Sequence, residues 1–248
     1  MMRYFAACLL IVVTASFARA QDEEPMSIRR LPVDLVQDQK EIWSFPLKPM
    51  KSSHWKPMVV LLSATAVLVA LDPHDTPYFR HTSTFADFDK KFSSTDTGLG
   101  EGIFPAGFYL TGLARGDSYV QKSGILSMEA LADAEGVAEV IKNVSRRRRP
   151  LEIPADGDFS ATWFKAGRGV LVNRGSFLSG HTTGAFAVAA VFAERYGRHR
   201  WVPFAAYGLA GLVAFSRVSN QNHFPSDVFA GAVIGYSISH FVVLRRDH

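Results

Sequence analysis

Long apolar segments separated by short polar turns constrain the fold of this chain most strongly. Within residues 118–143 the apolar positions recur at intervals of three and four, which is the period of one face of an α-helix. No run shows sustained strand-type alternation. The sequence therefore predicts an all-α fold, a helical bundle. The expected helices are Val33–Trp43, Met58–Leu71, Ile103–Ala114, Ser118–Asn143, Thr182–Tyr196, Trp201–Phe215 and Val228–Leu244.

The N-terminal residues predict an export signal. Arg3 precedes an apolar run that reaches Val13, and Ala18-Arg19-Ala20 forms a small-x-small cleavage site. The chain then divides into a signal peptide (1–20), a polar, proline-punctuated N-terminal extension (21–57) and one helical domain (58–248). An uncleaved membrane anchor at residues 1–20 is the alternative that we keep open.

The composition excludes some classes of protein. Cys8 is the single cysteine and lies inside the predicted signal, so the mature chain would contain neither disulfides nor thiolate ligands. Loss of Arg3 and Arg19 with the signal leaves 25 of the 27 basic residues against 23 acidic ones. This nearly neutral balance gives no reason to expect a nucleic-acid partner.

Three segments in the C-terminal half contain the groups of a phosphate-handling site: residues 142–150 (KNVSRRRRP), 178–183 (LSGHTT) and 216–227 (SRVSNQNHFPSD). Lys and Arg side chains can bind phosphate oxygens, and each Arg offers a planar pair of donors. Histidine can transfer protons or attack phosphorus near neutral pH, and a carboxylate can orient it. The candidate residues are Lys142, Arg149, Arg217, His181, His223 and Asp227.

The expected helices place these groups at helix ends and in connecting loops. The segment 178–183 leads directly into a helix, so that the free backbone N–H groups of Ser179 and Gly180 would form an anion cradle. Asp227 falls in the first turn of the last helix, where a carboxylate is favoured. We therefore expect the active site at one end of the bundle.

In order and spacing the three segments resemble the signature motifs of the superfamily that unites type 2 phosphatidic acid phosphatases, class A acid phosphatases and vanadium haloperoxidases. Its first motif is Lys, six residues and Arg-Pro, here Lys142 and Arg149-Pro150. Its second is Pro-Ser-Gly-His, here residues 178–181, with Leu178 in place of Pro. Its third is Ser-Arg, five residues, His, three residues and Asp, here residues 216–227.

The resemblance implies a metal-independent phosphatase domain that acts on a phosphomonoester or a lipid (pyro)phosphate and needs no cofactor. His223 would attack phosphorus, Asp227 would orient and charge it, and His181 would protonate the leaving oxygen. Two alternatives stay open: a haloperoxidase with vanadate bonded to His223, and a phospholipid-binding relative without activity. The implied phosphate-binding residues are Lys142, Arg149, Ser179, Gly180 and Arg217.

Other charged residues receive simpler interpretations. We expect Arg146, Arg147 and Arg148 to form a solvated face or to contact acidic lipid headgroups rather than to act directly in catalysis. Two further groups match no motif. The scattered acidic and histidine residues Asp72, His74, Asp75, Asp87 and Asp89 are interpreted as a polar loop, and His54, His81, His199, His240 and His248 as structural or surface residues.

The apolar segments also predict a relation to a membrane. They are shorter than the roughly 20 residues of a typical span. If residues 1–20 stayed in place as a first span, however, the order of the segments would fit six crossings with all three motifs on one face. We expect an exported protein whose site faces the periplasm, associated with the inner membrane. A soluble periplasmic domain is the alternative. The substrate would be a phosphorylated lipid or a small phosphoester.

Overall fold

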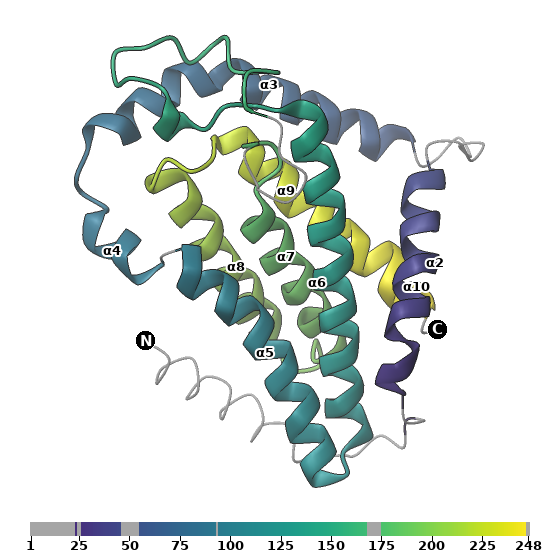
Figure 1. Cartoon of the computed structure of the whole chain (residues 1–248). Helices are drawn as coiled ribbons and strands as arrows, with labels where there is room; N and C mark the ends of the chain where they lie inside the picture. The colour runs from purple at the N-terminus through teal and green to yellow at the C-terminus, as the bar shows by residue number, and fades with distance from the viewer. Residues whose placement is uncertain (1–22, 24–25, 46–54, 93, 168–174, 247–248) are drawn as a thin grey trace.

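A computed structural model describes residue 23 and residues 26–45, 55–92, 94–167 and 175–246 (Figure 1). Every regular element in these residues is a helix, so the all-α prediction is confirmed. The predicted signal peptide and parts of the 21–57 extension lie outside the described residues. The elements are η2 (Ile28–Arg30), α2 (Leu31–Ser44), α3 (Trp55–His81), α4 (Ala86–Lys91), α5 (Ser94–Arg115), α6 (Ser118–Ser145), η4 (Pro150–Glu152), α7 (Gly180–Arg195), α8 (Trp201–Ser219), α9 (Pro225–Ile238), η5 (Ser239–Val243) and α10 (Leu244–Arg246).

Helix α7 forms the centre of the bundle and packs against α5, α6, α8 and α9 (Figure 1). Small residues let its neighbours come close. At Gly235 of α9 an added Cβ would lie 2.1 Å from the backbone oxygen of Thr183, and at Gly231 it would lie 3.0 Å from that of Ser179. Glycine is therefore required where α9 crosses the first turns of α7. This contact holds the second and third motif segments together.

Helices α5 and α6 form an antiparallel hairpin. Asp117 caps α6 by accepting a hydrogen bond from the Val120 backbone N–H at 3.0 Å, so the helix begins at Ser118, as predicted. Gly124 lets the pair approach closely, because a Cβ there would lie 2.4 Å from Tyr109 N. Phe108, Phe192 and Tyr196 then fill the space between this hairpin and α7.

Several helices differ from their predicted ranges. We predicted that the helix starting at Met58 would end at Leu71, before Asp72-Pro73, but α3 continues through Pro73 and Pro77 to His81. A proline inside a helix costs about 3 kcal/mol or more, and buried contacts made by Asp72 and Arg80, described below, offset it. Helix α5 starts nine residues before its predicted first residue, Ile103, and α8 continues past Phe215 to Ser219, so that it includes Arg217.

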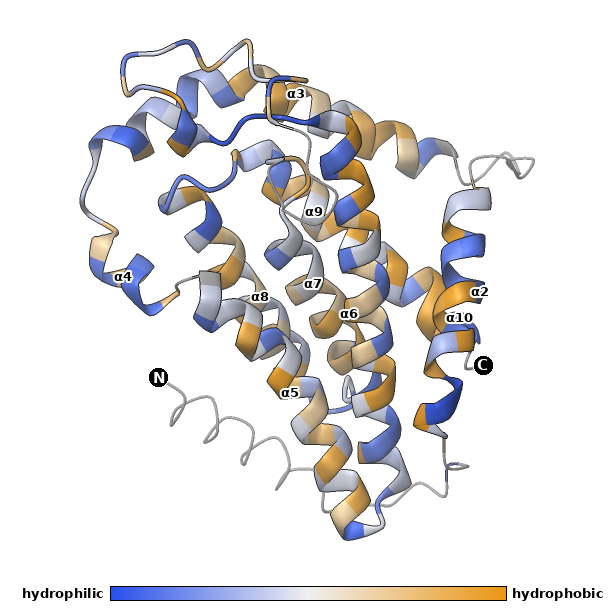
Figure 2. Cartoon of the chain, viewed as in Figure 1, coloured by the Kyte–Doolittle hydropathy of each residue, from blue (hydrophilic) through white to orange (hydrophobic). Residues whose placement is uncertain are grey.

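Three of the described helices are long and apolar enough to cross a membrane: Met58–His81, Trp201–Ser219 and Pro225–Arg246. In the first of these helices, only 6% of the most apolar 18-residue stretch is buried in the protein. Val60, Leu62 and Val67 expose apolar side chains in this helix. In Figure 2 hydrophobic residues cover much of α3, whereas the segment after α6 and the α8–α9 turn are hydrophilic and meet at one end. The protein therefore has an exterior suited to membrane association.

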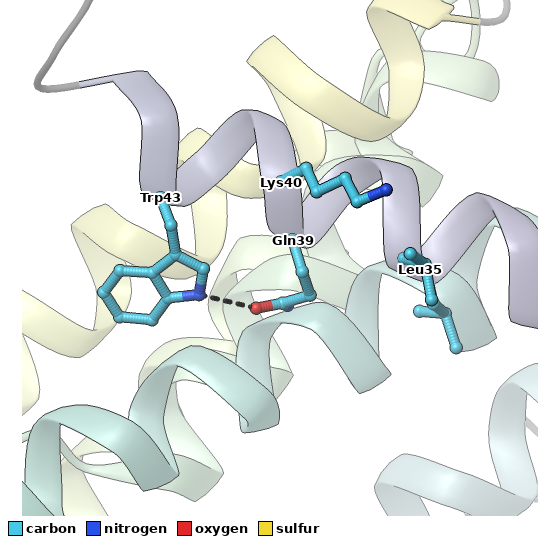
Figure 3. A pocket seen from close by; sticks show the side chains of 5 residues that line it. Leu35, Gln39, Lys40 and Trp43 are labelled. Carbon is cyan, nitrogen blue, oxygen red and sulfur yellow. Dashed lines mark hydrogen bonds between the residues drawn. The ribbon is translucent and has the colours of Figure 1, made fainter.

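Helix α2 is joined to α6 and to the C-terminal turn by a polar cluster. Arg246 donates hydrogen bonds to Asp38 at 2.6 Å and to Glu129, and Gln39 donates to Asp133 at 2.8 Å. Gln39 also accepts from Trp43 Nε1 at 2.9 Å beside a surface pocket on α2 (Figure 3). No motif residue takes part in this cluster. Within the described residues, its three carboxyl groups are the grouping with the spacing of metal ligands.

Candidate functional site

The first motif segment begins where α6 ends. Lys142 is buried in the last turn, and Arg146, in the left-handed conformation with φ 42°, ends the helix. The chain then continues in extended form, and its backbone is held on two sides. Arg148 N donates to Thr162 O at 2.9 Å, and Ser176 N donates to Arg147 O at 2.8 Å. These bonds place the first motif beside the segment that leads into α7.

The second motif segment forms the start of α7, with Ser179 as the residue before its first turn. An added Cβ at Gly180 would lie 2.7 Å from Lys142 Nζ, so the ammonium group of the first motif lies against this helix N-terminus. His181 follows, and an added Cβ at Gly98 of α5 would lie 3.4 Å from its Nε2. The start of α7 is thus flanked by α6 on one side and by the first turns of α5 on the other.

The third motif segment connects α8 to α9. Arg217 is buried in the last turn of α8, where it donates to Ser216 Oγ and to the backbone oxygen of Phe92, and its own carbonyl accepts from His223 N at 3.0 Å. Asp227 is the third residue of α9, and its side chain accepts a hydrogen bond at 2.9 Å from the backbone N–H of Phe224, the residue that precedes the helix. The Asp227 carbonyl accepts from Ser179 N at 3.2 Å, which joins this segment to the second motif.

His223 is held by a backbone carbonyl as well as by a carboxylate. Its Nδ1 lies 2.7 Å from Ser176 O and 3.8 Å from Asp227 Oδ2. Because a carbonyl oxygen can only accept, Nδ1 carries the hydrogen, and the lone pair is on Nε2. We expected Asp227 to orient the His223 ring, but the Ser176 carbonyl is the nearer partner. The Ser176 hydroxyl in turn donates a hydrogen bond to Asp227. Ser176 precedes the second motif and had no sequence signal.

Burial and charge keep His223 neutral. Burial lowers the pKa of His223 to about 4, Asp227 opposes this shift, and the cations Arg149 and Lys142 add to it. Arg149 is the motif arginine, and its charge favours the neutral form of His223. At neutral pH the Nε2 lone pair is therefore free to act as a nucleophile.

Two acidic residues beside the site matched no motif. Glu101 from α5 and Glu135 from α6 would both lie 3.3 Å from a Cβ on Gly184, one turn after His181. Burial, and then the charge of Glu135, raises the pKa of Glu101 well above its usual value. Burial also raises the pKa of Glu135, while nearby Lys142 opposes the shift. Both carboxyl groups thus add negative charge close to the motif cations when they ionise.

Two of the simpler interpretations were wrong. Arg147 is not part of a solvated face: its side chain is 2% exposed and pairs with Asp227 and with Asp72, each at 2.6 Å. Its guanidinium stacks on Phe224 at 3.8 Å and on Trp163 at 4.6 Å. Asp72, expected in a polar loop, is fully buried inside α3. Spacing could not distinguish Arg147 from its neighbours, because the left-handed turn at Arg146 decides which arginine points inward.

Comparisons with known proteins agree with the motifs. The family model described as PAP2 superfamily matches residues 124–247. The lipid A 1-phosphatase of Porphyromonas gingivalis is 44% identical over 61 residues, and the lipid A 4'-phosphatase of the same organism is 33% identical over 66 residues. These matches cover 24% and 27% of this chain, and 14% and 28% of the relatives' own lengths.

One solved structure is similar over most of the chain. It is the crystal structure of a transmembrane PAP2 type phosphatidylglycerolphosphate phosphatase from Bacillus subtilis. The match covers 88% of this chain and 96% of the other, with 19% sequence identity and a TM-score of 0.46.

Proposed function

Because this chain belongs to the PAP2 superfamily, we propose that it is a lipid phosphatase that forms a phosphohistidine on His223. The proposal depends mainly on the protonation state of the His223 side chain. Ser176 O accepts its Nδ1 hydrogen at 2.7 Å, and burial lowers its pKa to about 4. A neutral imidazole with a free Nε2 lone pair, close to the charges of Lys142 and Arg149, is suited to attack on phosphorus.

The proposed reaction has two steps. In the first, Nε2 of His223 forms a bond to phosphorus, the ester P–O bond breaks, and His181 gives its proton to the leaving oxygen. In the second, His181 removes a proton from water, whose oxygen attacks phosphorus, and the N–P bond breaks to release phosphate. Lys142, Arg149, Arg217 and the N–H groups at Ser179 and Gly180 stabilise the charge on the phosphate oxygens. No step in this proposal needs a metal or another cofactor.

The substrate class is proposed from the surroundings of the site. A surface pocket of about 370 Å³ lies between α3, α8 and α9. Phe79, Phe215, Val218 and Pro225 form its apolar part, and His74, Asp75 and Tyr78 complete the lining. Val218 follows Arg217, and Pro225 comes two residues after His223. The pocket therefore lies beside the third motif, where it can take the hydrocarbon chain of a lipid whose phosphate reaches His223. The lipid A phosphatases similar to this chain support a phosphorylated membrane lipid as the substrate.

The proposed location follows from the substrate and from the predicted export signal. The protein would be associated with the inner membrane, with its site on the periplasmic side. The three apolar helices support membrane association.

A trapping experiment tests the proposed function. The purified full-length protein in detergent is mixed with a lipid phosphate labelled in its phosphoryl group, quenched in alkali and separated by electrophoresis. Wild-type protein should keep an alkali-stable, acid-labile label, and His223→Ala should lose both the label and phosphate release. His81→Ala, which changes an exposed histidine outside the site, is the matched control. Turnover without a covalent label would contradict the phosphohistidine step, and halide oxidation with added vanadate and peroxide would favour the haloperoxidase.

A further inference from the structure

Arg147 bridges two buried carboxylates that come from different helices. Its Nη1 lies 2.6 Å from Asp227 Oδ1 in α9, and its Nη2 lies 2.6 Å from Asp72 Oδ2 in α3. Both carboxylates are fully buried, and the guanidinium is enclosed by Phe224 and Trp163. A buried charge that loses its partner is strongly destabilising, so these three side chains form a unit.

Asp72 also fixes the start of α9. It accepts a hydrogen bond from Ser226 N at 3.2 Å and another from Ser226 Oγ, and this hydroxyl itself accepts from Arg147 at 2.8 Å. Ser226 immediately precedes Asp227. A second polar contact ties α3 to the same turn, since Arg80 donates to Gln221 Oε1 at 2.7 Å and Gln221 donates to Phe79 O at 2.8 Å. Helix α3 therefore holds the turn that contains His223 at two places.

The charges of this unit bear directly on His223. One guanidinium faces two carboxylates, so the unit keeps one net negative charge. If Asp72 were neutral, Arg147 would be balanced by Asp227 alone, and the field of Asp227 at the imidazole would be weaker. The groups that face His223 are Asp227 from α9, Lys142 from α6, Arg149 from the following segment and the carbonyl of Ser176.

We propose that Asp72 is a positioning residue that acts through Arg147 to keep Asp227 aligned and negatively charged beside His223. This inference rests on the proposed function. A phosphohistidine places positive charge on the imidazole ring, which the carboxylate stabilises. In the part of the chain that the structure describes, Asp72 and the Arg147 side chain hydrogen-bond to each other and to Asp227, Ser226, Thr162 and Thr76, and the guanidinium stacks on Phe224 and Trp163. None of these partners is a proposed phosphate-binding residue. Loss of these contacts should therefore affect the chemical step more than substrate binding.

A double-mutant cycle with Asp72→Asn and Arg147→Gln tests this in the full-length protein in detergent. Each single variant should lower kcat roughly tenfold to a hundredfold, the scale for partners that orient an active group, with KM within about twofold. In the Arg147→Gln background, Asp72→Asn should lower kcat by clearly less than it does in the wild-type protein, because the connection to Asp227 through Arg147 is already broken and only the direct bonds to Ser226 remain to be lost. Additive losses in kcat would overturn the proposal.

The pH dependence of kcat/KM distinguishes this electrostatic role from a purely structural one. Arg147→Gln leaves two unbalanced carboxylates, which raises the pKa of His223 and moves the acid limb of kcat/KM to higher pH. Asp72→Asn leaves Asp227 fully paired with Arg147, so its acid limb should not move to higher pH. An upward shift of the same size in both variants would overturn the charge argument.

The outcomes separate this inference from the proposed function. If wild-type protein releases no phosphate from lipid phosphates, the proposed function fails. If wild-type protein is active and Asp72→Asn, with thermal unfolding showing a folded protein, keeps wild-type kcat, the inference alone fails. If the single variants do not fold, the double variant Asp72→Asn/Arg147→Gln is measured in their place. It removes the charges of both side chains together. Wild-type kcat in that double variant overturns the inference, and a reduced kcat with unchanged KM supports it.

Discussion

Lys142 and Gly180 meet where the end of α6 faces the start of α7, and a Cβ on Gly180 would lie only 2.7 Å from Lys142 Nζ. The same Cβ would lie 2.9 Å from Glu135 Oε2. Both charged groups are the far ends of flexible side chains, so a methyl group there can displace them without moving the backbone.

We accordingly expect Gly180→Ala to leave the protein folded but to lower its kcat/KM. Displacing Lys142 should lower kcat/KM by an amount equivalent to about 1.5–3 kcal/mol, the scale of a hydrogen bond to a charged group. Gly208→Ala in α8 is the control, since a Cβ there meets nothing within 4 Å. Steady-state kinetics on a lipid phosphate should distinguish the two variants, and equal kinetics would mean that Lys142 does not bind the substrate.

Gly235→Ala should act on stability. An added Cβ would lie 2.1 Å from Thr183 O, and neither backbone can yield easily because α7 is enclosed by its neighbours. Overpacking of this kind destabilises by about 1–3 kcal/mol. Gly211→Ala, where a Cβ meets nothing within 4 Å, should be neutral or slightly stabilising. Thermal unfolding in detergent measures the difference, and equal midpoints would show that α9 is free to move away from α7.

Stability should depend on pH through His223. Its pKa is lowered from 6.5 to about 4 in the folded protein, so between these values the unfolded chain binds a proton that the folded protein does not. The contribution, on the order of 3 kcal/mol, is fully present above pH 6.5 and is lost as pH falls towards 4. The unfolding midpoint of His223→Asn should fall less than that of wild type over this range. Parallel curves would contradict the buried, neutral state of His223.

Filling the pocket between α3, α8 and α9 should impair the hydrolysis of lipid phosphates but not that of soluble phosphoesters. Val218→Trp should raise KM for a long-chain lipid phosphate roughly tenfold, as expected for blocking a hydrophobic site, and leave a short soluble phosphoester unaffected. Val60→Trp, on the exposed face of α3, is the control for a larger apolar side chain elsewhere. If both substrates lose activity equally, the pocket does not hold the lipid chain.

The sequence predicted the fold class because long helices with apolar faces leave a strong periodic signal. It also predicted that Lys142, Gly180, His223 and Asp227 come from three separated segments at helix ends. The structure brings Lys142 against Gly180 and His223 beside Asp227. Their catalytic and binding roles remain proposals.

Contacts that depend on tertiary structure could not be predicted. Asp72-Pro73 is a common helix end, but buried bonds to Arg147 and Ser226 favour continuation of α3. Ser176 acts through its backbone carbonyl, which every residue has, so its side-chain type gave no indication. Glu101 lies two residues before the predicted start of its helix, Ile103, and its position beside Glu135 depends on the packing of α5 on α6 and α7.

The continuation of α3 past Pro73 has a consequence for the depth of the reaction. An α-helix rises 1.5 Å per residue, which places Asp72 about 20 Å along the axis from Met58. A hydrocarbon core is roughly 30 Å thick. If α3 crosses the bilayer along its normal with Met58 at one boundary, the Asp72–Arg147–Asp227 unit lies about 10 Å below the opposite boundary. Hydrolysis would then occur below the headgroup layer, and a lipid could lose its phosphate with its chains still in the membrane.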